Sequence, residues 1–236
     1  KAFSDVDDPP FQAELRYRQG ATWSAAGRYE DAKRALEDAA MLGVSSHHRS
    51  IAAEAWARLV FMETEVFSDF EAAHRAVRMA RAELVALGNP PRTLSVLRSH
   101  EAALAIREER YDDALETYTD LLALPDNQDP MRRADILINL AHVYVEQGDW
   151  KKARAAAGEY IDLYSETFGP EHPYLVLGYY TLGYIAHASG DYGGAVEPLL
   201  KSIALGRRSL QPNHPDLASA LSALCSVYEE LELYPE

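Results

Sequence analysis

Small and apolar residues recur along this chain with the spacing of amphipathic helices. After Tyr29, for example, Ala32, Leu36 and Ala39 follow at intervals of three and four residues, so they share one face of a helix. No segment alternates apolar and polar residues between turn signals, as a half-buried strand would. The pattern therefore predicts an all-α protein.

A short motif recurs at nearly regular intervals. It consists of a turn residue, a polar residue, an aromatic residue, two further residues and an alanine, and its aromatics stand at positions 29, 70, 111, 150 and 192, with Tyr234 as a sixth in register. The alanines that follow each complete motif are Ala32, Ala73, Ala114, Ala153 and Ala195. Self-similarity at a fixed period of this length indicates stacked supersecondary units. We therefore expect antiparallel helical hairpins that turn at the aromatic and bury the alanine.

The periodicity predicts about 5.5 repeats of ~41 residues and about 11 helices. The first helices of the hairpins are expected at 11–26, 48–66, 91–109, 130–147, 173–189 and 215–232, and the second helices at 29–42, 70–87, 111–124, 150–167 and 192–208. The repeats span approximately 11–47, 48–89, 90–129, 130–171, 172–213 and an incomplete 214–236. Residues 1–10 are expected to form an N-terminal extension of a single solenoid domain over 11–236.

The recurring motif resembles the tetratricopeptide repeat (TPR), which has a small residue in its first helix, an aromatic after a Gly-Asp turn and an alanine opening its second helix. The usual unit of this family has 34 residues, so the longer period here implies longer helices. In the C-terminal half, Phe168–Pro173 and Leu210–Pro215 are similar to the Gly-Pro-x-His-Pro connector of the long, kinesin light chain-type subclass. The resemblance implies a right-handed superhelical α-solenoid.

The same resemblance implies that ligands bind on the concave face, which the first helices line. Transferring the family's binding positions residue by residue places Tyr17 and Arg18 in the first unit. In later units it gives a candidate groove of Arg58, Met62, His100, Leu104, Arg107, Asn139, His142, Tyr180, Tyr184 and His187. The cations and hydrogen-bond donors of this set suit a carboxylate-bearing or extended polar segment.

Composition limits the classes of partner. The chain has 236 residues with 23 Lys plus Arg and 37 Asp plus Glu, so its net charge of −14 argues against a nucleic-acid backbone as ligand. No apolar run is long enough for a membrane span, so no membrane association is expected. The single cysteine, Cys225, allows no internal disulfide and fits a reducing, cytoplasmic compartment.

No catalytic or metal-binding constellation can be assembled from the sequence, so we expect neither enzyme activity nor a cofactor. His172 and His214 lie at equivalent places before a proline, which indicates connector capping rather than metal ligation. Cys225 occupies a small-residue position of its helix, so we interpret it as a packing residue rather than a nucleophile.

The leading hypothesis is a scaffold that binds a peptide or protein segment without chemistry. The alternatives are a regulatory or sensing region of a larger bacterial signalling protein, such as a serine/threonine kinase or a transcription regulator, and a self-assembly module. The chain starts at Lys1 and stops just after a helical pattern, so we expect it to be part of a longer protein. The apolar surface around Leu231 and Leu233 is expected to be covered by another chain, giving a homo-oligomer, or by further sequence.

Overall fold

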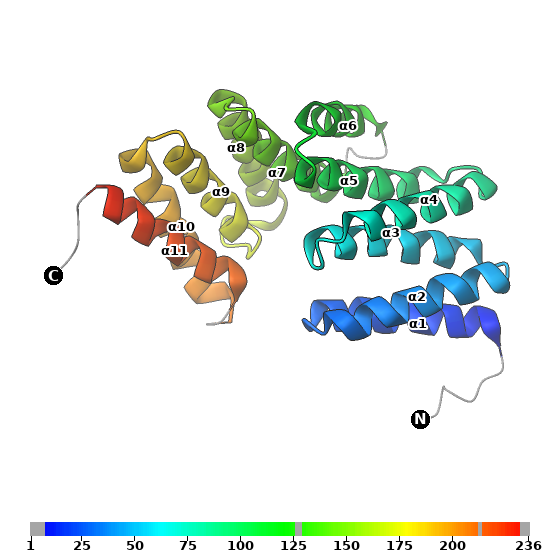
Figure 1. Cartoon of the computed structure of the whole chain (residues 1–236). Coiled ribbons are helices and arrows are strands. Elements are labelled where there is room, and N and C mark those ends of the chain that lie inside the picture. Colours follow the sequence, from blue (N-terminus) through cyan, green and yellow to red (C-terminus); the bar gives the residue numbers. More distant parts are fainter. Residues whose placement is uncertain (1–7, 126–128, 212–213, 232–236) are drawn as a thin grey trace. The chain divides into compact units, whose positions relative to one another are not determined.

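The computed structural model describes residues 8–125, 129–211 and 214–231, which form eleven helices and no strand. The chain is therefore all-α, as predicted, and Figure 1 shows the helices as successive hairpins. The first helices of the hairpins are α1 (Pro9–Ala25), α3 (Arg49–Glu65), α5 (Pro91–Arg107), α7 (Pro130–Glu146), α9 (Leu175–Ala188) and α11 (Pro215–Glu230). The second helices are α2 (Tyr29–Ser45), α4 (Phe70–Ala86), α6 (Tyr111–Ala123), α8 (Trp150–Phe168) and α10 (Tyr192–Ser209).

Most predicted helix boundaries lie within two residues of the observed ones, and every second helix begins at its predicted aromatic. The start of α9 differs, because it begins at Leu175 rather than at residue 173. The amide of Leu175 donates to the carbonyl oxygen of His172, and that of Val176 to Pro173, which are the i→i+3 bonds of a tight turn. Tyr234, the sixth aromatic, lies outside the described residues.

The turn inside each hairpin places one residue in the left-handed backbone region, two positions before the aromatic. Three of these residues are glycines, which adopt a positive φ without a steric penalty. The other two are Ser68, with a φ of 54°, and Glu109, with a φ of 60°. The following helices begin with an aspartate cap in three hairpins, where Asp69, Asp149 and Asp191 accept a hydrogen bond from a first-turn amide. The turn chemistry is thus local, which is why it can be recognised from sequence.

The five motif alanines are completely buried, which confirms their predicted packing role. Two glycines of first helices show how closely the paired helices approach. A Cβ built on Gly20 would lie 2.7 Å from Cγ of Leu36, and one on Gly183 would lie 2.5 Å from Cγ of Leu199. The small residues of the first helices therefore let the second-helix leucines dock against bare backbone.

The chain divides into two compact units, Lys1–Thr117 (unit 1) and Tyr118–Glu236 (unit 2), with the division inside α6. In unit 1, α1, α3 and α5 pack side by side as one layer, and α2 and α4 pack on α3 from the other layer. In unit 2, α7, α9 and α11 form the equivalent first-helix layer, with α8 and α10 packed on α9. The assignment of residues 11–236 to a single domain stays a prediction.

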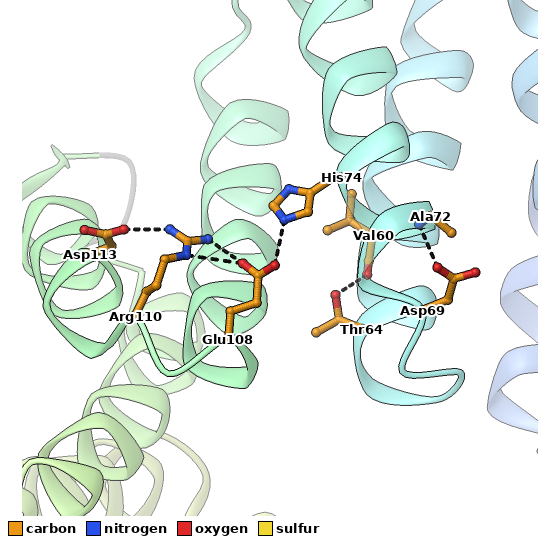
Figure 2. A network of polar contacts seen from close by, with 8 residues as sticks. All are labelled: Val60, Thr64, Asp69, Ala72, His74, Glu108, Arg110 and Asp113. Atoms are coloured by element: carbon orange, nitrogen blue, oxygen red, sulfur yellow. Dashed lines mark hydrogen bonds and ion pairs between the residues drawn. The ribbon is translucent and has the colours of Figure 1, made fainter.

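A polar network holds α4, α5 and the start of α6 together in unit 1 (Figure 2). Oε1 of Glu108 lies 2.7 Å from Nε2 of His74, and its Oε2 accepts a 2.7 Å hydrogen bond from Arg110, which also donates to Asp113 at 2.6 Å. Partial burial acts to raise the pKa of Glu108, but the hydrogen bonds from Arg110 and His74 outweigh it and lower the pKa. The network fixes the end of α5 relative to α4.

The last helix of unit 2, α11, differs from the prediction made for Cys225. Leu224 and Val227 of α11 are buried against α9 and α10, whereas Cys225 is exposed. Consecutive residues of a helix point about 100° apart, so the helix face that buries Leu224 turns Cys225 outward. The predicted packing role of Cys225 is therefore wrong. Leu231 is partly buried against the same cluster, and Leu233 lies outside the described residues.

Candidate functional site

The first-helix layer of unit 1 contains a cavity of about 620 Å³. Its residues come from three successive first helices, α1, α3 and α5, and the α3 members recur every three to four residues on one helical face. The lining comprises Tyr17, Glu54, Ala57, Arg58, Phe61, Arg92, Thr93, Val96 and His100. A volume of this size suits a side chain or a short peptide stretch.

The cavity is cationic although the chain is acidic. The guanidinium of Arg58 lies over the ring of Tyr17, 5.7 Å from its centroid, and neither Arg58 nor Arg92 has an ion-pair partner among the described residues. Glu54 is the one carboxylate among the lining residues. Two unpaired guanidinium groups on a chain of net charge −14 are suited to an anionic group of a ligand.

His100 connects two of the helices that form the cavity. Its Nδ1 lies 2.7 Å from the carbonyl oxygen of Ala57, so Nδ1 carries the proton and donates it. The ring of Phe61 lies 5.6 Å from the imidazole. Burial lowers the pKa of His100, the hydrogen bond to Ala57 partly opposes this, and the charge of Arg58 lowers it further. The imidazole is therefore neutral at pH 7.

This lowered pKa predicts an acid sensitivity of unit 1. The unfolded chain, in which His100 has its ordinary pKa of about 6.5, binds the proton more readily than the folded chain, so stability falls as pH drops below about 6.5. In urea unfolding between about pH 7.5 and 5, the wild type should lose more unfolding free energy than His100→Gln, whose amide can still donate to Ala57. Parallel losses in the two proteins would contradict a neutral, partly buried His100.

The structure brings Arg58 and His100 together in this cavity, but it places two predicted groove residues elsewhere. Met62 is completely buried and Leu104 is 2% exposed, so neither can contact a ligand. Phe61, which the sequence reasoning missed, is 42% exposed and lines the cavity in place of Met62. The prediction that Met62 and Leu104 face a groove is therefore wrong. Arg107 is exposed but lies outside the cavity lining.

The burial of Met62 has a local cause in the turn that ends α3. In most hairpins the residue before the aromatic donates to the carbonyl five residues back, as Asp149 does to Tyr144. Asp69 instead donates to Glu63, six residues back, because the α3–α4 turn contains one extra residue. The turn after α5 has the ordinary length, because Arg110 donates to the carbonyl of Ala105 five residues back. It therefore does not account for the burial of Leu104.

In unit 2 the remaining predicted residues lie partly exposed on α7 and α9, which contact each other. The rings of Tyr180 and Tyr184 stack with centroids 6.3 Å apart. The amide of Asn139 donates to the carbonyl oxygen of Asp135 on its own helix at 2.9 Å. Burial lowers the pKa of His142, while the charge of Glu146 raises it in part. The fifth predicted residue in this region is His187, whose ring lies 5.4 Å from that of Tyr192.

Of the two connector histidines, His214 caps α11, whereas His172 accepts a hydrogen bond in the turn before α9 and is not its N-cap. Nδ1 of His214 accepts a hydrogen bond from the amide of Asp216 at 3.2 Å, which confirms its predicted role, and Nδ1 of His172 accepts from Tyr174 at 3.4 Å. In the described ranges, no three His, Cys, Asp or Glu side chains are grouped so that they could hold a metal ion. Nor does any described helix combine the length and the apolar character needed to cross a membrane.

Known proteins share both a sequence pattern and a fold with this chain. Residues 132–208 match the family model described as tetratricopeptide repeat. The fold is similar to that of BtubC (BKLC) from P. vanneervenii, with 19% identity, a TM-score of 0.61 and coverage of 97% of this chain and 86% of that one. It is also similar to a putative kinesin light chain from P. anserina with nearly identical TPR-like repeats. That structure has 15% identity, a TM-score of 0.63 and coverage of 86% of this chain and 98% of that one. A third protein with a similar fold is PilW, a type IV pilus biogenesis factor, with 17% identity, a TM-score of 0.62 and coverage of 92% of this chain and 90% of that one. No curated protein sequence matches the chain.

Proposed function

We propose that the chain is a non-catalytic scaffold built of tetratricopeptide-like repeats, whose first-helix face binds a peptide or protein segment. The observation that carries the proposal is the cavity on α1, α3 and α5, in which Arg58 and Arg92 have no ion-pair partner among the described residues. Repeat arrays of stacked helical hairpins present such faces as extended binding surfaces.

The residues of this cavity define the segment that it accepts. The two guanidinium groups bind a carboxylate, which each can engage through paired N–H donors. Phe61 and Val96, both more than 40% exposed, offer apolar contacts next to these cations. The segment is therefore extended, carries a carboxylate and places an apolar side chain beside it. Glu54 in the lining disfavours a uniformly acidic ligand.

The experiment is a binding screen with one array of short peptides synthesised twice, with a free C-terminal carboxylate and with a C-terminal amide. We expect the best free-acid peptides to lose about tenfold in affinity on amidation, measured by fluorescence anisotropy, because the charge-assisted hydrogen bonds are lost. The variants Arg58→Gln and Arg92→Gln should reduce the preference for the free acid.

The matched control is Arg34→Gln, which removes a cation from α2 that is already bound to Asp31 at the surface. This variant should bind the same peptides as the wild type. If the Arg58→Gln/Arg92→Gln double variant keeps both the affinity and the free-acid preference, this cavity is not the binding site.

A further inference from the structure

Unit 1 has a second cavity, of about 480 Å³, which the proposed peptide site does not use. It lies between the second helices α2 and α4, with α3 behind them, and thus belongs to the other layer of the hairpins. Its lining comprises Lys33, Glu37, Trp56, Leu59, Glu63, Asp69, Ala72, Arg75, Ala76, Arg78 and Met79.

Two buried polar atoms of this lining have no hydrogen-bond partner within the described part of the chain. They are Nε1 of Trp56, a donor, and Oε2 of Glu63, an acceptor. The Glu63 side chain is 5% exposed, and its other oxygen, Oε1, accepts a 2.7 Å salt bridge from Nζ of Lys33. Leaving a buried polar group without a hydrogen-bond partner costs free energy, and more if the group is charged. A ligand that satisfied both atoms would remove this cost.

The spacing of these two atoms along α3 sets the shape of such a ligand. Trp56 and Glu63 are seven residues apart, so they lie on one face of the helix, two turns or about 10 Å from each other. Leu59 lies between them on α3, and Ala76 lines the α4 side. The ligand is therefore elongated, with an apolar middle between a donor at one end and an acceptor at the other.

The charges differ between the two ends of the cavity. Near Lys33 the carboxylates of Glu63, Glu37 and Asp69 all interact with the one ammonium group. Burial acts to lower the pKa of Lys33, but these three carboxylates outweigh it and raise the pKa. Three negative charges around one positive charge leave this end acidic, so it favours a cationic donor.

The opposite end is cationic. On α4, Arg78 follows Asp69 by two and a half turns, and because α4 runs antiparallel to α3, it lies toward the Trp56 end. Arg78 has no ion-pair partner among the described residues, whereas Arg75 is bound to Glu71 at 2.9 Å. An acceptor that also carries negative charge, such as a carbonyl or carboxylate, suits the indole N–H and this arginine.

We propose that the cavity between α2, α3 and α4 is a second binding site, which takes a linear ligand with a guanidinium or ammonium group at one end, an aliphatic middle and a carbonyl or carboxylate at the other. The cation binds Oε2 of Glu63, and the oxygen acceptor binds the indole N–H of Trp56. Free arginine or lysine has this chemistry, and so does an arginine or lysine residue within a peptide.

The test is a titration of the whole ¹⁵N-labelled chain, followed by the indole N–H resonance of Trp56, which is assigned by its absence in Trp56→Phe. The probes are L-arginine, its uncharged analogue L-citrulline and Nα-acetyl-arginine amide. We expect arginine or its blocked form to shift this resonance and to bind at least about tenfold more tightly than citrulline. Binding of free arginine assigns the site to a small molecule, and binding of the blocked form alone assigns it to a peptide side chain.

Glu63→Gln keeps the shape of the side chain, removes its charge and should abolish the preference for arginine. If Glu63→Gln does not fold, Trp56→Phe is the second variant, because it removes the indole N–H and keeps an aromatic ring in the same place. It should weaken arginine binding about threefold, as measured by calorimetry. The control Glu65→Gln neutralises an exposed carboxylate of the same helix that does not line the cavity. The proposal is overturned if no probe shifts the Trp56 resonance, if citrulline binds as tightly as arginine, or if neither Glu63→Gln nor Trp56→Phe weakens binding.

Discussion

Replacing Gly183 with leucine is expected to lower the unfolding free energy of unit 2 by about 3 kcal/mol. Gly183 faces α10 at the closest approach of the two helices, where even an added Cβ would lie 2.5 Å from Cγ and 2.7 Å from Cδ2 of Leu199. Leu199 is completely buried, so it cannot swing into solvent to make room. The helix pair must therefore separate, and neighbouring contacts are lost with it. Chemical unfolding followed by circular dichroism measures the effect.

The matched control is Gly158→Leu in the middle of α8. A Cβ added at Gly158 has no heavy atom within 4 Å, so the larger side chain meets open space. Leucine is a better helix former than glycine by somewhat under 1 kcal/mol, so this variant should be as stable as the wild type or slightly more stable. If Gly183→Leu unfolded at the same denaturant concentration as Gly158→Leu, the close approach of α9 and α10 would be wrong.

The second large effect concerns a partly buried ion pair between α3 and α4. Nη1 of Arg49 lies 2.8 Å from Oε2 of Glu83, and the Glu83 side chain is 8% exposed. Arg49→Met removes the cation and leaves a carboxylate in a site with little access to water. Breaking a buried pair in this way costs about 3–5 kcal/mol, and because Arg49 is itself 40% exposed we expect the lower end.

The double variant Arg49→Met/Glu83→Met separates two costs, that of leaving the Glu83 carboxylate without a partner and that of losing packing. It should recover most of the stability, because replacing both charges with apolar side chains leaves no buried charge without a partner. Arg18→Met, which breaks the exposed pair with Glu14, should change the unfolding free energy by less than about 0.5 kcal/mol. If Arg49→Met and Arg18→Met lost equal amounts of unfolding free energy, the Glu83 carboxylate would have to be hydrated, and the prediction would be wrong.

The sequence by itself determined the helices, because the signals that begin and end them are local. The Asp69, Asp149 and Asp191 caps, the left-handed glycines and the alanine three residues after each aromatic act within a few residues of the turn. A repeated local signal needs no knowledge of the neighbouring hairpins. The starts of all five second helices and the burial of the motif alanines could therefore be predicted.

The sequence did not determine which residues of the first helices face the cavity. Of the predicted residues, Arg58 and His100 line the cavity, whereas Met62 and Leu104 lie in the core. A shift of one residue rotates a helical position by about 100°, which is enough to exchange a groove side chain for a buried one. Counting back from a turn can therefore find a helix without finding its exposed face.

Only the tertiary structure decided which side chains of different helices meet. The cavity between α2 and α4 depends on Lys33, Trp56 and Asp69, which lie on different elements and share no sequence motif. The exposure of Cys225 likewise depends on which face of α11 the neighbouring helices cover. Helix formation follows from neighbours along the chain, but cavities, ion pairs and exposed faces follow from packing between helices, whose energy arises from contacts between residues far apart in sequence.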